Sequence, residues 1–183
     1  VTHFRSSANQ GLLVYLALNK EKALSRELLS TLLWPEETEL TARHNLRQAL
    51  YRLRGLLQDR RQSGQPFLLV TRHTVQFNPD SDHWLDVTAF RALLETAEAD
   101  RPAPQRLQEA IALYRGDLLE SIYEDWLLYD REKYRLQYLN SLNKLMVFHG
   151  LNGNYERGLS YGDQILAREN TRENVHRQMM WLY

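Results

Sequence analysis

Cysteine is absent from the 183 residues, which excludes both a disulfide framework and a thiolate metal site. The longest apolar run is far shorter than the roughly 20 residues of a membrane-spanning helix. Residues 1–9 have neither the basic start nor the apolar stretch of a signal peptide. These absences predict a cytoplasmic protein that has no membrane partner.

Motifs for catalysis or cofactor binding are also missing. The sequence has no glycine-rich phosphate loop ending in Lys and Ser or Thr, and no two histidines four residues apart, which argues against nucleotide hydrolysis and zinc-protease chemistry. Asp80, Asp82 and Asp86 suggest the start of a calcium loop, but Arg91 stands where the bidentate glutamate belongs. We therefore expect no catalytic residue, no metal and no cofactor.

The formal net charge is zero, but the charges are unevenly distributed. Residues 1–80 hold eleven Lys or Arg against seven Asp or Glu, and residues 81–183 hold twelve against sixteen. The front half is therefore basic and the back half acidic. Arginine is densest between residues 43 and 61, at Arg43, Arg47, Arg52, Arg54, Arg60 and Arg61. On charge alone, such a cluster is as typical of a solvated helix face as of a DNA contact.

The chain begins with a short alternating segment followed by a helix. Residues 1–4 are predicted to end a strand, and Ser6 or Ser7 can cap a helix that ends near Asn19. The apolar side chains of this helix share one face and are Leu12, Leu13, Leu16 and Ala17.

A short second helix follows an extended link at Ala23 and Leu24. Ser25 is its predicted N-cap, and it ends at Pro35 because the residue before a proline is pushed out of helical geometry. Trp34 then lies at the tip of the helix. The leucines predicted to point inward are Leu28, Leu29, Leu32 and Leu33.

The third helix is predicted to run from near Thr38 to about Leu57, roughly 30 Å at 1.5 Å per residue. Its apolar stripe repeats at helical spacing and consists of Leu46, Leu50, Leu53 and Leu57, with Ala49 at the edge. A rotation of about 100° per residue places polar residues on the opposite face, namely Thr41, His44, Asn45, Gln48, Tyr51, Arg52 and Gly55.

A loop rich in turn residues then leads to two predicted strands, 67–70 and 74–77, around a turn at 71–73. Two helices at an angle, followed by a hairpin, outline a winged helix-turn-helix. We assign this domain to residues 1–80.

Residues 78–83 form a linker, and everything from residue 84 to residue 183 is predicted to be helical. The predicted helices are 88–99, 105–114, 123–149, 154–167 and 171–183. The long helix has two adjacent apolar stripes, Leu127, Tyr134, Tyr138, Leu142 and Leu145 in one and Leu128, Leu139 and Met146 in the other. Small and aromatic residues follow, among which Gly158 and Gly162 are expected to allow close helix packing. This pattern is typical of tetratricopeptide-like repeats.

The final predicted helix has apolar residues that no later element covers. Val175, Met179 and Leu182 share a face, and Met180 and Trp181 lie beside it. Because a stacked repeat buries such a surface against the next repeat, we expect the chain to be part of a longer protein and to associate through this end. The alternative is that this helix folds back fully onto the helix before it.

Several motifs resemble a known family of regulators. In the front half they are Leu12-Leu13-Val14-Tyr15-Leu16-Ala17-Leu18, Ser25-Arg26-Glu27-Leu28-Leu29, Leu32-Leu33-Trp34-Pro35 and Ala42-Arg43-His44-Asn45-Leu46-Arg47-Gln48-Ala49-Leu50. In the back half they are Trp84-Leu85-Asp86-Val87, Tyr114-Arg115-Gly116-Asp117-Leu118-Leu119 and Asp125-Trp126-Leu127. Together they resemble the winged helix and the bacterial transcriptional activator domain of the Streptomyces antibiotic regulatory protein type. The resemblance implies a mainly α fold, in which a partial winged helix with a C-terminal hairpin wing precedes an all-α tetratricopeptide-like domain.

The resemblance assigns DNA contacts to the polar face of the third helix. Side chains with paired donors and acceptors read base edges, and the candidates are Asn45, Gln48, Tyr51 and Arg52. Flanking side chains suit phosphate contacts, and the candidates are Trp34, Arg43, His44, Arg47, Arg54 and Arg72. The alternatives are a solvated face, surface ion pairs and, for Trp34, a place in the core.

The predicted function is recognition of double-stranded promoter DNA by a transcriptional activator, with the helical domain serving self-association, signal input or contact with RNA polymerase. Glu36, Glu37 and Glu39 form an acidic turn that corresponds to a candidate polymerase contact in related activators, although they also suit the N-terminal dipole of the third helix. A rival interpretation is a helical scaffold whose winged helix binds protein. The near-neutral pI favours the scaffold, and the arginine placement favours DNA.

Overall fold

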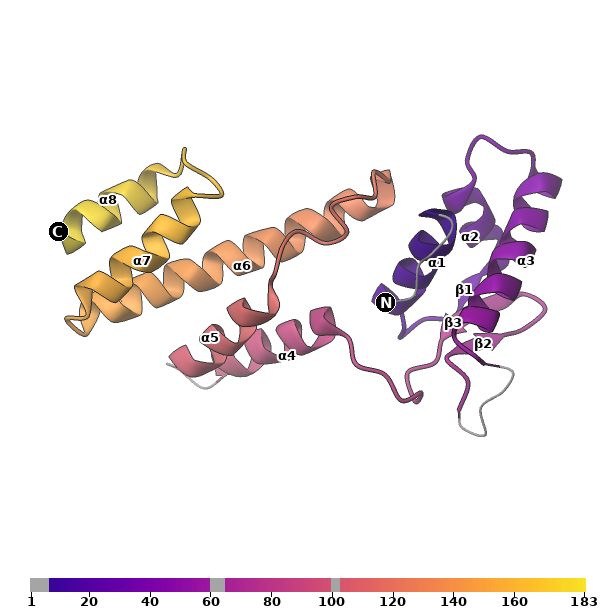
Figure 1. The fold of residues 1–183 in the computed structure, drawn as a ribbon, viewed down its shortest axis with the longest axis horizontal. Helices are drawn as coiled ribbons and strands as arrows, with labels where there is room; N and C mark the ends of the chain where they lie inside the picture. The colour runs from indigo at the N-terminus through magenta and orange to yellow at the C-terminus, as the bar shows by residue number, and fades with distance from the viewer. Residues whose placement is uncertain (1–6, 60–64, 100–102) are drawn as a thin grey trace. The chain divides into compact units, whose positions relative to one another are not determined.

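The computed structural model describes residues 7–59, 65–99 and 103–183, and the chain divides into two compact units, 1–83 and 84–183 (Figure 1). The expected strand at 1–4, the alternative cap Ser6 and the arginines Arg60 and Arg61 lie outside the described residues.

The described part of the first unit is a helix-turn-helix with a small sheet. Its elements are α1 (Ser7–Leu18), β1 (Leu24–Ser25), α2 (Arg26–Leu33), α3 (Glu39–Leu56), β2 (Leu68–Val70) and β3 (Thr74–Phe77). The sheet is antiparallel in the order β1-β3-β2, with Leu24 opposite Val75 and Leu68 opposite Phe77. The extended link before α2 is therefore a strand of the sheet, which joins the hairpin to the helices.

Side-chain caps fix the start of both helices of the helix-turn-helix. The Leu28 backbone N–H donates to Ser25 Oγ at 3.1 Å, and the Thr41 N–H donates to Thr38 Oγ1 at 3.4 Å. Both capping residues have extended backbone geometry, as an N-cap requires. Trp34 is the C-cap of α2 and Pro35 follows it, so the predicted end of this helix is confirmed.

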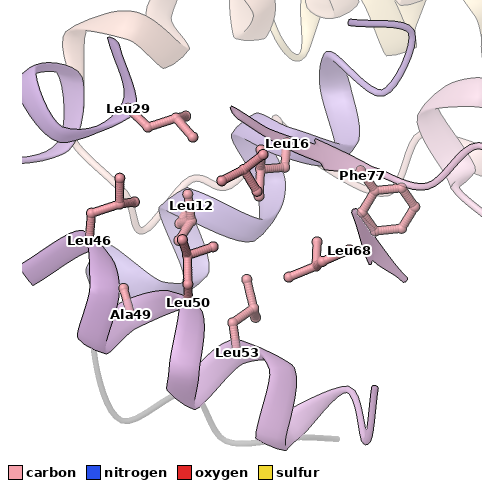
Figure 2. Close-up of a cluster of buried hydrophobic side chains, with 10 residues drawn as sticks. Leu12, Leu16, Leu29, Leu46, Ala49, Leu50, Leu53, Leu68 and Phe77 are labelled. Atoms are coloured by element: carbon pink, nitrogen blue, oxygen red, sulfur yellow. The ribbon is translucent and has the colours of Figure 1, made fainter. Parts of the chain in front are cut away.

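The core of the first unit is mostly leucine (Figure 2). Side chains from α1, α2, α3 and the hairpin converge there, and the fully buried set is Leu12, Leu16, Leu29, Leu46, Ala49, Leu50, Leu53, Leu68, Val75 and Phe77. The stripe predicted for α3 is confirmed, with Leu57 packed at its edge. This core holds α3 so that its polar face points to solvent.

The prediction that Leu28 points inward is wrong, because its side chain is 44% exposed. In α2 the buried residues are Leu29 and Ser30. At about 100° per residue, Leu28 lies on the face of the helix opposite the side that these two residues share. Four leucines in eight residues cannot all face one core.

The described second unit is a series of packed helices. Its elements are α4 (Asp86–Ala99), α5 (Pro104–Leu113), α6 (Asp125–Leu151), α7 (Tyr155–Leu166) and α8 (Glu173–Leu182). Each helix packs on the next one along the chain, and α6 also contacts α8 and α4, the latter through the ion pair of Lys144 with Glu98 (Figure 1). Among the described residues, no helix has the length and apolar character that crossing a bilayer requires.

The first apolar stripe of α6 is confirmed, but the second one is only partly buried. Leu139 and Met146 are fully buried, whereas Leu128 is 53% exposed, so the prediction for Leu128 is wrong. The reason is the length of the covering helix. α7 spans about 18 Å and packs back along the C-terminal part of α6, which spans about 40 Å, so it does not reach the first turn (Figure 1).

The expectation for the last helix needs correction. Val175 and Met179 are buried, and Leu182 is partly buried, because α8 folds back against α7 and α6. A Cβ at Gly162 would lie 2.6 Å from the sulfur of Met179, so the predicted close packing at this glycine is confirmed. Met180 and Trp181 nevertheless remain exposed, so α8 does not bury all its apolar side chains.

Candidate nucleic-acid interface

The exposed side of α3 carries two rows of polar side chains. At about 100° per residue, the first row falls within about 60° of the helix circumference and contains Thr41, Asn45, Gln48 and Arg52. The second row falls within about 40° and contains Arg43, Arg47 and Arg54. His44 and Tyr51 lie between the rows. The rows match the division into base-reading and phosphate-contacting candidates.

The side chains of Arg47, Gln48 and Arg52 are exposed. Within the described ranges, none of the three has an ion pair or a side-chain hydrogen bond. Tyr51 is 60% exposed, and Asn45 is half-buried at the edge of the face. The donors and acceptors of Arg47, Gln48 and Arg52 are thus available to a ligand.

The three arginines of the second row differ in their surroundings. Arg43 forms an ion pair with Glu39 one turn earlier. Arg54 is partly buried, and its Nε is shielded from solvent without a hydrogen-bond partner among the described residues. Arg47 is therefore the arginine of this row that is both exposed and unpaired in the described structure.

Trp34 and His44, two further phosphate candidates, occupy contrasting positions. Trp34 is partly buried and packs against the leucine core, as the core interpretation of this residue requires. His44 is exposed on α3 between the two rows.

The turn between β2 and β3 is held by a threonine. Thr71 Oγ1 accepts hydrogen bonds from the N–H groups of His73 and Thr74, at 3.2 and 2.9 Å. The backbone N–H of Arg26 donates to the carbonyl of His73, and Arg26 Nη1 donates to the carbonyl of Thr71. The turn thus forms without glycine, is tied to the start of α2, and leaves Arg72 exposed at its tip.

A carboxylate joins α3 to the hairpin. Asp59 accepts hydrogen bonds from the backbone N–H groups of Phe67 and Leu68, at 2.7 and 3.1 Å. Sequence reasoning missed Asp59, Thr71 and Arg26 as positioning residues. Asp59 and Arg26 act on backbone groups that are eight or more residues away along the chain, whereas Thr71 acts within its own turn. The sequence contains one signal for Asp59, which is that it is the single acidic residue in an arginine-rich stretch.

The turn between α2 and α3 is acidic and exposed. Glu36 and Glu37 have no ion pair in the described structure, whereas Glu39 lies in the first turn of α3 and pairs with Arg43. Leu40 is 81% exposed beside them, which the sequence analysis did not single out. Glu39 therefore has a structural role, and Glu36, Glu37 and Leu40 form a free surface.

In the helical unit, the motif from Tyr114 to Leu119 organises an aromatic and charged cluster. The Tyr114 hydroxyl donates to Asp117 at 2.5 Å, and its ring stacks on Tyr138 at 4.2 Å. The Arg168 guanidinium lies over both rings. Burial raises the pKa of Tyr114, and the hydrogen bond to Asp117 raises it further. These contacts join the segment after α5 to α6 and to the end of α7.

No group of three or more His, Asp or Glu in the described ranges could hold a metal ion. Residues 85–183 match the family described as the bacterial transcriptional activator domain. No curated protein matches the chain with significance. Since the matched residues make up more than half of the sequence and coincide with the helical unit, the chain belongs to the bacterial transcriptional activator domain family.

Proposed function

We propose that this protein is a sequence-specific activator of the Streptomyces antibiotic regulatory protein type, which reads promoter DNA with α3. The observation that carries the proposal is the polar face of α3, where exposed and unpaired Arg47, Gln48 and Arg52 stand on a rigid leucine core. Gln and Arg side chains present the paired groups that read base edges in a major groove. The family of the helical unit supports a role in transcription.

In this proposal, the two rows of α3 have different tasks. Asn45, Gln48 and Arg52, with Tyr51 beside them, contact base edges. Arg47 contacts phosphates, with Arg43, His44 and Arg54 at its sides, and Arg72 reaches the backbone or the minor groove from the wing. Trp34 acts by holding the turn between α2 and α3 on the core.

The surface formed by Glu36, Glu37 and Leu40 is the proposed contact with RNA polymerase. Carboxylates would be repelled by phosphates, so this surface suits a protein partner better than DNA. The exposed Leu40 supplies apolar area that a protein contact can use. The helical unit is the proposed site of self-association.

The test is binding of the purified chain to fragments of its own upstream DNA and to random DNA, at two salt concentrations. We expect tighter binding to one upstream fragment and an affinity for both DNAs that falls as salt rises. Absence of DNA binding at low salt would reject the proposal and favour the helical scaffold, whose winged helix binds protein.

A further inference from the structure

An open apolar groove lies at one end of the helical unit, between α6 and α8. Its volume is about 970 Å³, and its walls include Val147, Leu151, Tyr155, Trp181 and Tyr183. Trp181 is 90% exposed and Leu151 is 84% exposed, which is unusual for side chains of this size.

The floor of the groove is built by close helix packing. A Cβ at Gly150 would lie 2.5 Å from Leu182 Cδ2, so α8 approaches α6 closely here and a larger residue would require the Leu182 side chain to shift. Gly158 of α7 meets the same leucine, at 3.1 Å from an added Cβ. The groove is therefore a fixed feature of the α6–α8 contact.

The groove carries one positive charge. Arg177 lines it and has no ion pair or side-chain hydrogen bond within the described ranges. Among the described residues that line the groove, none is acidic. A ligand that combines apolar side chains with a carboxylate would complement this surface.

A surface of that composition exists on the same helix, at its other end. In the first three turns of α6, the exposed apolar side chains are Leu128, Tyr129 and Leu136, and they share about a third of the circumference with Asp125 and Glu132. Glu132 already pairs with Arg135, whereas Asp125 has no ion pair in the described structure. This second surface, which we call the α6 start, is apolar and acidic.

We propose that the groove of one copy of this chain binds the α6 start of a second copy, with Trp181 packed on Tyr129 and Arg177 paired with Asp125. Because the two surfaces differ, the contact is head-to-tail and leaves one groove and one α6 start free in a pair. The inference deepens the proposed self-association of the helical unit and does not depend on DNA binding.

The test is sedimentation of the full chain without DNA over a range of concentrations. We expect reversible association of the wild type and of Trp84→Ala, which removes an exposed tryptophan outside both surfaces. Trp181→Ala and Tyr129→Ala should each weaken association about tenfold or more, because each removes a central aromatic contact. Both side chains are exposed, so the circular dichroism melting curves should not change.

Mixing the two variants distinguishes this head-to-tail contact from other modes of association. Trp181→Ala retains an intact α6 start and Tyr129→Ala retains an intact groove, so an equimolar mixture should form a 1:1 pair that grows no further. A monomeric wild type at all concentrations would overturn the proposal. So would variants that associate like the wild type, or a mixture that associates no better than its components.

Discussion

Gln48 and Arg52 lie in the row of α3 that we propose faces the bases, and Arg47 lies in the other row, so their substitutions should affect DNA binding differently. Gln48→Ala or Arg52→Ala should cost about 1–3 kcal/mol on the specific site and little on random DNA, because base contacts carry the discrimination. Arg47→Ala should weaken binding to both and lower the salt slope by about one. Titrations on both DNAs at several salt concentrations measure each effect.

Arg43→Ala is the matched control for Arg47→Ala. It belongs to the same row, but its guanidinium already pairs with Glu39. We expect a smaller change in salt slope for Arg43→Ala. Equal losses on specific and random DNA for Arg52→Ala would reject its base-reading role.

At the scale of single residues, the sequence predicted which side chains of α3 share a face, but not whether each one is buried or paired. Periodicity places Arg43, Arg47 and Arg54 on one row, and it cannot show that Arg54 is partly buried or that Arg43 is paired. The prediction that Leu28 points inward was wrong for the same reason. Which side chains are covered depends on neighbours that are distant in sequence, and a local pattern carries no information on them.

At the scale of the elements, glycine has opposite roles in α3 and α7. A Cβ at Gly55 would meet nothing within 4 Å, so Gly55→Ala should raise the free energy of unfolding by about 0.5–1 kcal/mol through the reduced freedom of the unfolded chain. A Cβ at Gly162 would lie 2.6 Å from the Met179 sulfur and 3.1 Å from that of Met146. Gly162→Ala should therefore lower stability by about 1–3 kcal/mol, as overpacking does.

Chemical denaturation of both variants, compared with the wild type, measures these changes. The two substitutions are chemically identical and both lie within helices, so helix propensity cancels in the comparison. A Gly162→Ala protein as stable as Gly55→Ala would show that α7 and α8 are not packed closely.

His149 makes the α6–α7 contact sensitive to pH. Its side chain is 5% exposed, neither ring nitrogen has a hydrogen-bond partner among the described residues, and its ring stacks on Tyr161. Burial lowers the pKa of His149, and nearby Arg157 lowers it further. The folded state then binds a proton less readily than the unfolded state.

Stability should therefore be fully present above the unfolded pKa of about 6.5 and decline as the pH falls below that value towards the folded pKa. Thermal unfolding followed by circular dichroism between about pH 7.5 and 5.5 measures this decline. His149→Phe keeps the ring contact without the proton and should reduce the pH dependence. An undiminished dependence in this variant, matching that of the exposed His176→Gln control, would contradict the role of His149.

For the whole molecule, the order and type of the described elements could be predicted from sequence, because long amphipathic helices and two short strands around a tight turn have strong local signals. The packing of α8 could not be predicted. Val175 and Met179 were expected to be exposed, but both are buried because α8 folds back against α7, where Gly162 leaves room for Met179. The groove beside Trp181 arises from that same packing and has no signature in α8 alone.

An activator must bind DNA and recruit a partner, and the exposed turn before α3 should separate these tasks. Glu36 and Glu37 form no ion pair in the described structure, so the double substitution Glu36→Lys, Glu37→Lys should leave the fold unchanged. Two added cations should not weaken binding to phosphates. Transcription from the target promoter in a reconstituted reaction should nevertheless fall about tenfold or more, because the charge of the surface proposed to contact the polymerase is reversed.

Leu40→Ala tests the same surface without a change in charge, since Leu40 is exposed and lies outside the leucine core. It should lower transcription while the affinity for DNA stays the same. Glu21→Lys, an exposed charge reversal away from the turn, is the control that should leave both unchanged. Full transcription by the Glu36→Lys, Glu37→Lys protein at saturating DNA occupancy would show that this turn is not the polymerase contact. Because DNA affinity is measured separately from transcription, that outcome would leave the recognition role proposed for α3 intact.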